Sequence, residues 1–386
     1  MKTIAILYGG KSGEHEVSLI SAASIVRQLN AKKYKVLLIG IKKTGEWLLQ
    51  DASALKSART AAKADEKTGE GAGGRQDMSG LPPISQGQRV FVAPGAGLFV
   101  EKRDGGTENL GCDIVFPVLH GTFGEDGTIQ GLLECAGLPY VGAGVLGSAI
   151  GMDKHVAKEL WLREGLPVVD SILVRAADRA NPQFMANLSR KIEARFGWPC
   201  FVKPSSCGSS VGASKAGNME ALEAALDIAL AYDEKVLVEK FISAREIECA
   251  VLGNEKPKAF APGEIMPAHE FYDYEAKYKD PNGATLCVPA SIPPQQAETI
   301  QALAVKAYKA CGLSGMARVD FFIDRRTGDI LINEVNTIPG FTAISMYPRM
   351  CEAGGLPYPE LLDTLLSLAV ERFERREALS YSYEKG

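Results

Sequence analysis

The sequence has no run approaching the roughly 18 consecutive apolar residues that a membrane-spanning helix requires. Its N-terminal apolar run, residues 4–8, is too short for the core of a secretory signal peptide and ends in two glycines. The chain also lacks an excess of positive charge, since its formal net charge is −4. These absences predict a cytoplasmic protein without a membrane or nucleic-acid partner, and they leave small molecules as the expected ligands.

The eight cysteines form no CxxC pair and no spacing typical of a zinc site, so we expect reduced thiols. Two nucleotide-binding fingerprints are also missing from the glycine-rich segment that follows the first apolar run. The pattern GxGxxG does not occur there, and Ala5 stands where a Walker A motif would require glycine. The sequence therefore disfavours a dehydrogenase of the Rossmann type.

What the sequence does contain is an α/β pattern. Its 386 residues suggest two or three domains, at roughly 100–200 residues per domain. Residues 3–8 predict a buried strand, followed by a glycine-rich turn and a helical pattern that continues to Leu29; residues 34–41 and 112–119 predict two further strands. Glu14 falls near the start of the first helix. There it either stabilises the helix or binds a ligand beyond the carboxyl end of the first strand, and both interpretations stay open.

Residues 51–88 have few large apolar side chains and are rich in Ala, Gly, Lys and Ser. This composition predicts a partly mobile insertion with a short helix near residues 52–64. His120 ends the third predicted strand before a glycine-rich turn, where it either contacts a ligand or caps the turn. Residues 142–144 indicate a crossing to the next domain, ahead of a strongly helical segment at residues 152–163.

Residues 200–212 combine an apolar strand, which carries Lys203, with a loop of serines and glycines. The backbone N–H groups and hydroxyls of such a loop can surround phosphate oxygens, although most loops of this kind are simply turns. Residues 236–246 predict another strand with Glu239 and Glu246. Their carboxylates suit the amino group of adenine and the ribose hydroxyls, and exposed glutamates at a strand end are the alternative.

Two short segments, Arg-Val-Asp and Glu-Val-Asn, flank a polar stretch and predict a hairpin. If the hairpin turns about Thr327 without a bulge, Asp320 lies opposite Glu334. Arg318 then lies opposite Asn336, and all four side chains share one face. Carboxylate and amide oxygens suit Mg²⁺, which would bind water and nucleotide phosphates as its other ligands. The hairpin thus predicts a magnesium centre for phosphoryl transfer, and an exposed hairpin with ordinary polar residues is the alternative.

Together these motifs resemble the ATP-grasp carboxylate–amine ligases and, among them, the D-alanine–D-alanine ligases. The resemblance runs in the family's order from residue 2 to beyond residue 370. Its departures are the insertion at residues 51–88 and Cys207, which stands in the phosphate loop. The segments that carry the resemblance are residues 9–18, 120–121, 152–154, 200–212, 238–240, 271–278, 318–320 and 333–342.

The resemblance implies ATP and D-alanine as substrates, and two Mg²⁺ ions for which Mn²⁺ can substitute. ATP would phosphorylate the carboxylate of one D-alanine, and the amine of a second would attack the acyl phosphate, in the synthesis of peptidoglycan precursors. The implied metal ligands are Asp320, Glu334 and Asn336. Arg318 and the backbone N–H of Gly340 would form the oxyanion hole.

The resemblance also implies the remaining ligand contacts. Glu14 would anchor the ammonium of the first D-alanine and hydrogen-bond with Ser209 and Tyr278. Ser345 would bind the carboxylate of the second D-alanine, and Lys277 would lie near the transferred phosphate. Tyr278 is similar to the tyrosine of ligases that use D-alanine rather than D-lactate as acceptor. The other implied contacts with ATP and substrate are His120, Lys154, Lys203, Ser210, Glu239, Lys240, Ile242 and Glu246.

The implied architecture is a three-domain α/β ATP-grasp fold. An N-terminal domain with an open parallel sheet would span residues 1–142, a central ATP-binding domain residues 143–242, and a C-terminal domain with the metal site residues 243–386. Residues 266–290 would form a lid that substrate orders and that keeps water from the acyl phosphate. Residues 359–376 predict an amphipathic helix packed on the core. The resemblance also implies that the protein forms a homodimer.

Two alternatives stay open. A ligase with D-serine or D-lactate as acceptor would keep the nucleotide and metal residues and change the acceptor pocket. A nucleotide-binding regulatory protein without turnover would be expected to lack a metal ligand or Arg318, and the sequence lacks none of these.

Overall fold

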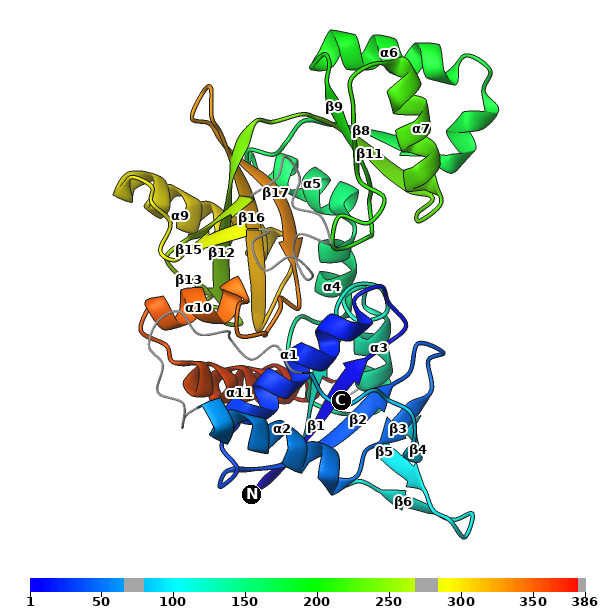
Figure 1. Cartoon of the computed structure of the whole chain (residues 1–386), viewed down its shortest axis with the longest axis vertical. Helices are drawn as coiled ribbons and strands as arrows, with labels where there is room; N and C mark the ends of the chain where they lie inside the picture. Colours follow the sequence, from blue (N-terminus) through cyan, green and yellow to red (C-terminus); the bar gives the residue numbers. More distant parts are fainter. Residues whose placement is uncertain (66–79, 268–283, 381–386) are drawn as a thin grey trace, which may run out of the picture.

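The structure, a computed structural model, describes residues 1–65, 80–267 and 284–380. Three sheets follow one another along the chain, each with helices packed against it (Figure 1). The N-terminal sheet lies at one end of the molecule, the central sheet at the other, and the C-terminal sheet between them. Within these ranges, no helix combines the length and the apolar character needed to cross a membrane.

The N-terminal sheet has seven strands, in the order β6-β5-β4-β3-β2-β1-β7. They are β1 (Lys2–Gly9), β2 (Tyr34–Ile41), β3 (Trp47–Leu49), β4 (Gln88–Ala93), β5 (Gly97–Glu101), β6 (Thr107–Asn109) and β7 (Ile114–Val118). Its main helices are α1 (His15–Gln28), α2 (Ala52–Asp65) and α3 (Thr128–Cys135). The predicted parallel sheet is confirmed for β2, β1 and β7. Strands β3 to β6 extend it in antiparallel fashion, which the sequence analysis did not foresee.

Burial on both faces explains the uninterrupted apolar run of β1. Ile4 and Ile6 belong to one hydrophobic cluster with residues of α1, whereas Ala5 and Leu7 belong to another with residues of α3. Because helices cover both sides, neither face of the strand can be polar. The run therefore ends only where the chain leaves the sheet, at the turn that carries Glu14.

The predicted short helix of the insertion is confirmed as α2. Ala54 and Ala58 on this helix are buried in the cluster beneath α1, together with Leu81 from the far end of the insertion. The few apolar side chains of this segment thus anchor both ends. Residues 66–79, part of the 51–88 segment that was predicted to be partly mobile, lie outside the described residues.

The central sheet has four antiparallel strands in the order β10-β9-β11-β8. Its elements are β8 (Ser171–Arg175), η1 (Ala176–Ala180), α6 (Phe184–Arg195), β9 (Cys200–Pro204), β10 (Ser214–Ala216), α7 (Met219–Leu230) and β11 (Lys235–Lys240). Its hydrophobic cluster draws only on residues 172–238, so this unit has a core of its own.

The C-terminal sheet has the order β15-β14-β12-β16-β17, with β13 paired to β12. Its elements are β12 (Ala244–Leu252), β13 (Lys258–Ala259), β14 (Gly263–Pro267), β15 (Ala284–Cys287), α9 (Pro294–Ala310), β16 (Met316–Asp324), β17 (Ile330–Asn336), α10 (Met346–Ala353) and α11 (Tyr358–Glu377). Strands β14 and β15 pair at the two ends of the predicted lid. Residues 268–283, the rest of that lid up to β15, lie outside the described residues.

The apolar side chains of the segment after residue 143 pack in the core of the C-terminal sheet. It forms α4 (Val145–Met152) and α5 (Lys154–Arg163), separated by Asp153, whose Oδ1 accepts a hydrogen bond from Val156 N at 3.2 Å. Trp161 is fully buried against α9, and its indole N–H donates to Ala307 O at 3.1 Å. Ala157 and Trp161 of α5 belong to the C-terminal hydrophobic cluster, and Ile150 of α4 packs against it. The division of the chain at residue 143 stays a prediction.

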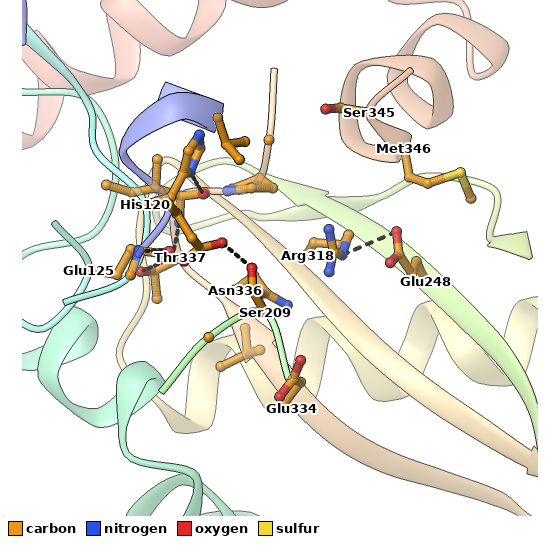
Figure 2. Close-up of a pocket in the computed structure, with 18 of the residues that line it drawn as sticks. His120, Glu125, Ser209, Glu248, Arg318, Glu334, Asn336, Thr337, Ser345 and Met346 are labelled. Atoms are coloured by element: carbon orange, nitrogen blue, oxygen red, sulfur yellow. Dashed lines mark hydrogen bonds and ion pairs between the residues drawn. The ribbon is translucent and has the colours of Figure 1, made fainter. Parts of the chain in front are cut away.

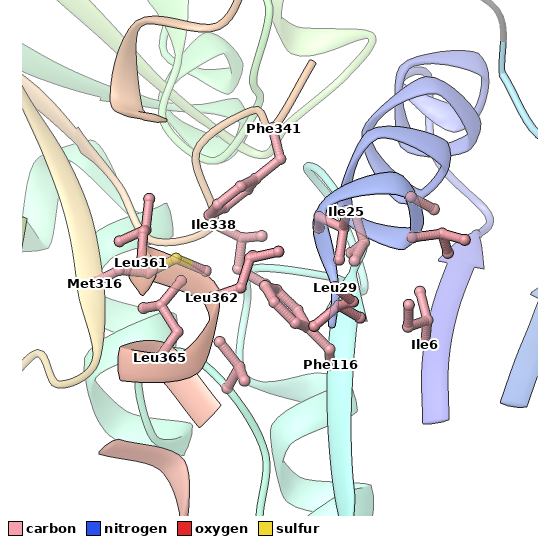
Figure 3. Packing of buried hydrophobic residues seen from close by; sticks show 14 of the residues in the cluster. Ile6, Ile25, Leu29, Phe116, Met316, Ile338, Phe341, Leu361, Leu362 and Leu365 are labelled. Carbon is pink, nitrogen blue, oxygen red and sulfur yellow. The ribbon is translucent and has the colours of Figure 1, made fainter. Parts of the chain in front are cut away.

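The predicted amphipathic helix is confirmed as α11, and it joins two of the sheets. Figure 3 shows Leu361, Leu362 and Leu365 of this helix beside Phe116 of β7 and Met316 of β16. All five belong to one buried cluster. The N-terminal and C-terminal sheets are therefore held in a fixed relation, which is what a site formed between them needs.

Candidate active site

The hairpin of β16 and β17 has the predicted pairing at its open end. Arg318 lies opposite Asn336, and Asp320 lies opposite Glu334. The assumption of a hairpin without a bulge is wrong, because the register shifts by one residue directly after Asp320. The turn is also centred half a residue before Thr327. The bulge offsets this displacement, so the four site residues pair as predicted.

The extra residue of the bulge is Asn333, and it has a role that the sequence analysis missed. Asn333 and Glu334 both line the same cavity, although neighbours in a regular strand point to opposite faces. Lys203 Nζ donates to Asn333 Oδ1 at 2.9 Å. Because a bulge is not visible in an apolar/polar pattern, no signal in the sequence could have identified this contact.

Three oxygen-bearing side chains gather at the hairpin. Asn336 Nδ2 donates to Asp320 Oδ2 at 2.9 Å, and Glu334 Oε2 lies 3.5 Å from Lys154 Nζ. In the part of the chain that the structure describes, no group of three or more His, Cys, Asp or Glu residues could hold a metal. The third donor here is the amide of Asn336. An all-oxygen set of two carboxylates and an amide fits a hard divalent cation rather than zinc.

Arg318 is buried among carboxylates. Its Nε and Nη2 donate to the two carboxylate oxygens of Asp320, each at 2.7 Å, and Glu248 Oε2 lies 3.1 Å from Nε. Burial alone would lower the pKa of Arg318, but Asp320 and Glu248 outweigh it and hold that pKa well above its usual value. The guanidinium is therefore always charged. Glu248 was missed, although its spacing of two residues from Glu246 puts both on one face of β12.

Lys203 and a second lysine hold Glu239 from two sides. Glu239 Oε2 lies 2.9 Å from Lys203 Nζ, and its Oε1 lies 2.6 Å from Lys158 Nζ. Burial would raise the pKa of Glu239, but the two ammonium groups outweigh it and lower that pKa. Burial lowers the pKa of Lys158 to about 8, against the opposing effect of Glu239. Lys158 was not predicted, and its position one helical turn after Lys154 was the available signal.

The serine and glycine loop after β9 has an unusual backbone. Ser209 and Ser210 have φ values of 51° and 58°, in the left-handed region that residues with side chains seldom adopt. Lys154 Nζ donates to the backbone oxygen of Cys207 at 2.7 Å, so the carbonyl of that residue, not its thiol, makes this contact. Burial raises the pKa of the Cys207 thiol. Strained loops of this kind occur where a backbone must approach a ligand closely.

Glu14 lies between two glycines from different parts of the fold. Ser209 Oγ donates to Glu14 Oε1 at 2.5 Å. A Cβ atom at Gly121 would lie 2.7 Å from Glu14 Oε2, and one at Gly208 would lie 2.9 Å from the same atom. Both glycines are therefore required for the carboxylate to occupy this place. The contact ties the N-terminal sheet to the loop of the central sheet.

His120 and a nearby acid connect the N-terminal sheet to the loop after β17. His120 Nδ1 donates to Ile338 O at 3.0 Å, and its Nε2 lies 3.0 Å from Ser21 Oγ. Glu125, which the sequence analysis missed, accepts from Thr337 Oγ1 at 3.1 Å and from Ile338 N at 2.7 Å. Burial raises the pKa of Glu125. Figure 2 shows His120, Glu125 and Thr337 gathered on one side of the pocket.

The loop after β17 brings Gly340 and Ser345 together. A Cβ atom at Gly340 would lie 2.7 Å from Ser345 Oγ, so only glycine fits there without a shift. The hydroxyl of Ser345 also contacts Thr342, whose backbone N donates to it at 2.9 Å. Ser345 stands directly before α10 and makes no capping hydrogen bond to that helix.

Two adjoining cavities collect every predicted site residue that the structure describes. The smaller cavity, of about 140 Å³, is lined by Glu14, His120, Lys154, Ser209, Arg318, Glu334, Asn336, Gly340 and Ser345. The larger, of about 590 Å³, is lined by Lys154, Lys203, Ser209, Ser210, Glu239, Lys240, Ile242, Glu246, Arg318, Asp320 and Glu334. The two cavities meet at the residues that line both, which include Lys154, Ser209, Arg318 and Glu334. Lys277 and Tyr278 lie outside the described residues.

Two family models match the chain. The family model of the D-ala D-ala ligase N-terminus matches residues 3–143, and that of the C-terminus matches residues 160–367. The chain is 49% identical over 371 residues to the D-alanine–D-alanine ligase of Treponema denticola, with 96% of each chain covered. It is 46% identical to the D-alanine–D-alanine ligase A of Bradyrhizobium diazoefficiens, with 98% of each covered.

Two solved structures are similar over nearly their whole length. The D-alanine–D-alanine ligase of Coxiella burnetii has a TM-score of 0.79 at 37% identity, with 98% of this chain and 97% of that chain covered. The VanG D-Ala:D-Ser ligase of Enterococcus faecalis has a TM-score of 0.78 at 35% identity, with 95% and 99% covered. On these grounds the chain belongs to the D-alanine–D-alanine ligase family, whose members are ATP-dependent ligases with the ATP-grasp fold that act in peptidoglycan synthesis.

Proposed function

We propose that the chain joins two D-alanine molecules in two steps at the junction of its cavities. A carboxylate oxygen of the first D-alanine attacks the γ-phosphorus of ATP, and ADP leaves. The amine of the second D-alanine then attacks the carbonyl carbon of the D-alanyl phosphate, and inorganic phosphate leaves. The observation that carries this proposal is the meeting of a nucleotide-sized cavity with a small one at Arg318 and Glu334.

In this proposal the larger cavity holds ATP. Lys154 and Lys203 neutralise the nucleotide phosphates, and Ser210 adds a hydroxyl from the strained loop. Glu239 and Glu246 accept hydrogen bonds from the nucleoside. The backbone around Lys240 and Ile242 completes the wall on that side. The contacts of Glu239 with two lysines support the assignment, because they fix a carboxylate that would otherwise rotate.

Asp320, Glu334 and Asn336 would hold the divalent cation that the family uses, and we propose two Mg²⁺ ions, for which Mn²⁺ can substitute. The all-oxygen donor set supports this choice of metal. When bound, such a cation neutralises charge on the nucleotide phosphates and on the transferred phosphoryl group. The residues of the chain do the rest: Arg318, fixed in its charged form by its neighbours, donates to the oxyanion of the tetrahedral intermediate.

The smaller cavity would bind the two D-alanine molecules. Glu14 accepts hydrogen bonds from the ammonium of the first, and Ser345 donates to the carboxylate of the second. The backbone N–H of Gly340 completes the oxyanion hole beside Arg318. Its lining by Glu14, Arg318 and Ser345 supports this assignment, because these polar groups suit the ammonium and carboxylate of an amino acid. Tyr278 and Lys277 are proposed, from the family resemblance alone, to close the site and to lie near the transferred phosphate.

We also propose that the enzyme works in the cytoplasm as a homodimer. All eight cysteines are unpaired, which supports a reducing compartment. Leu146 on α4 is 70% exposed and Leu162 on α5 is 51% exposed, and apolar side chains of this kind are often covered at a subunit contact. A measured mass of twice that of the chain, unchanged on dilution through the working concentration, is expected.

The test of the proposed function is product analysis with Mg²⁺ and ATP. D-Alanine alone is expected to give ADP, phosphate and dipeptide in equal amounts, and L-alanine none. Hydroxylamine added with one equivalent of D-alanine is expected to trap the D-alanyl phosphate as D-alanyl hydroxamate. Dipeptide without a trappable acyl phosphate would contradict the two-step route, and the absence of both would contradict the ligase assignment.

A second acceptor is worth testing because a relative at 35% identity is a D-Ala:D-Ser ligase. D-Serine and D-lactate should each be offered together with D-alanine, and the mixed products quantified against the D-alanine dipeptide. A mixed product in excess would assign the acceptor subsite to the alternative substrate and leave the roles of the nucleotide residues unchanged.

A further inference from the structure

The guanidinium of Arg318 has two carboxylate partners at once. It makes a bidentate pair with Asp320, with both N···O distances at 2.7 Å. Glu248 Oε2 lies 3.1 Å from the same Nε, and Figure 2 shows the two side chains facing each other. Arg318 thus lies between a proposed metal ligand and a buried acid to which neither the sequence motifs nor the proposed mechanism gives a role.

The sheet explains why these groups meet. In the pairing of β12 with β16, Glu248 lies directly opposite Asp320. On the other side of β16, Asp320 lies opposite Glu334. Directly opposed residues point to the same face of a sheet. The face that carries the proposed metal ligands therefore extends by one strand, onto β12.

Arg318 and a metal ion would compete for the same atoms. Two N–H groups of Arg318 and one of Asn336 already donate to the oxygens of Asp320. A cation that binds Asp320 needs at least one of those oxygens and also repels the guanidinium. Metal binding must therefore weaken the pair between Arg318 and Asp320.

We propose that Glu248 is a positioning residue that retains the guanidinium of Arg318 when a divalent cation takes Asp320. Glu248 is only 5% exposed and lines both cavities, so its carboxylate is held where Arg318 can pair with it without leaving the junction. The catalytic consequence rests on the proposed function, since Arg318 must stay near the acyl carbon. The exchange of partners itself depends only on the three side chains and the cation.

Loss of the Glu248 carboxylate has two consequences in this scheme. Of these two carboxylates, Arg318 then has Asp320 alone to pair with. It therefore competes more strongly with the cation for the oxygens of Asp320. Once the cation does bind, the guanidinium has no second anchor and is poorly placed for the oxyanion. Cation affinity and turnover number should therefore fall together, while the KM for D-alanine changes little.

The first measurement is Mn²⁺ binding in the presence of ADP, where no turnover occurs. Electron paramagnetic resonance detects the binding. We expect Glu248→Gln to weaken Mn²⁺ binding about tenfold, because it removes the buried ion pair that holds Arg318 when Asp320 binds the cation. Glu264→Gln is the matched control: Glu264 is 3% exposed on β14 and pairs with Arg245 at 2.7 and 2.6 Å. It should lose stability and keep its Mn²⁺ affinity.

A double-mutant cycle separates positioning from simple loss of negative charge. In the Arg318→Met background, Glu248→Gln should leave Mn²⁺ binding unchanged if Glu248 acts through Arg318. An equal loss of affinity with and without Arg318 would overturn the proposal, and so would wild-type affinity in Glu248→Gln itself. If Glu248→Gln does not fold, Glu248→Met, of similar volume, carries the same cycle.

The outcomes also separate this inference from the proposed function. A wild-type enzyme that makes dipeptide, together with a Glu248→Gln variant that binds Mn²⁺ normally, overturns the positioning role alone. A wild-type enzyme that makes no dipeptide but shows the predicted cycle in Mn²⁺ binding overturns the proposed function alone.

Discussion

Two parts of the site bring their residues together in different ways. The hairpin of β16 and β17 positions Arg318, Asp320, Glu334 and Asn336 within a single sheet, through backbone pairing. The contact of Glu14 with Ser209 instead joins the N-terminal sheet to a strained loop of the central sheet. The first arrangement depends on local register, whereas the second depends on how separate units are held against each other.

The difference suggests a division of labour. The residues proposed for phosphoryl transfer and oxyanion stabilisation, which need a fixed geometry, lie on paired strands. Recognition of the small substrate lies at a contact between separate units of the fold, where Ser209 of the loop donates to Glu14 of the N-terminal unit. We therefore expect substitutions in the hairpin to reduce turnover number, and substitutions at the Glu14 contact to act mainly on the KM for D-alanine.

The strongest test of the hairpin is Glu334→Gln. Loss of one carboxylate from the proposed metal site should lower kcat by about a thousandfold or more, because a bound cation contributes several kcal/mol to transition-state stabilisation. The melting temperature should stay near that of the wild type, since Glu334 is partly exposed. A variant with ordinary turnover would remove Glu334 from the metal site.

Arg318→Ala should have the next largest effect. One oxyanion donor typically contributes about 10²–10³ in kcat, so a loss of that size is expected without a comparable change in the KM for ATP. The change also leaves Asp320 and Glu248 without their shared cation, and some loss of stability should accompany it. Turnover at the wild-type rate in the folded variant would exclude Arg318 from the oxyanion hole.

The same division explains how much of the site the sequence could predict. The hairpin residues lie within a short stretch of chain, and period-two alternation is enough to put them on one face. The prediction succeeded even though the bulge at Asn333 was missed, because the displaced turn compensated for it. The order of elements and the buried strands were predictable for the same reason, namely that they depend on local patterns.

Contacts between distant segments were not predictable from residues alone. Glu125 reaches the loop after β17 across more than 200 residues, and Lys158 is held by Glu239 from another sheet. Strands β3 and β6 have three residues each, too few to show an alternating pattern, and the sequence analysis named none of the strands β3 to β6. The family resemblance supplied the role of Glu14, and only the structure showed that Gly121 and Gly208 leave room for it.

Gly121→Ala tests the contact between units. The new Cβ would lie 2.7 Å from Glu14 Oε2, so the carboxylate must shift and its hold on the substrate ammonium should weaken. We expect the KM for D-alanine to rise about tenfold or more, on the scale of one hydrogen bond to a charged group, with kcat less affected. Steady-state kinetics with D-alanine as the variable substrate measures the split.

The matched control for Gly121→Ala is Gly137→Ala. Both glycines have left-handed backbones, with φ of 73° and 69°, but a Cβ at Gly137 meets nothing within 4 Å. Each substitution should cost about 1–2 kcal/mol of stability through backbone strain. Only Gly121→Ala should change the KM for D-alanine, and an equal rise in both variants would attribute the effect to strain rather than to Glu14.

The smallest expected effect is that of Ser209→Ala, and it separates two functions within one loop. This substitution removes the hydrogen bond of 2.5 Å to Glu14 without touching the carboxylate, so kcat/KM for D-alanine should fall by about tenfold or less. The neighbouring Ser210→Ala, with a similar φ, should instead raise the KM for ATP, because Ser210 lines only the larger cavity. If both variants changed the same Michaelis constant, the loop would act as a single clamp, and the contrast between a substrate contact and a nucleotide contact would be wrong. An effect of Ser209→Ala on D-alanine alone and of Ser210→Ala on ATP alone would show that two adjacent hydroxyls of the left-handed loop serve different ligands.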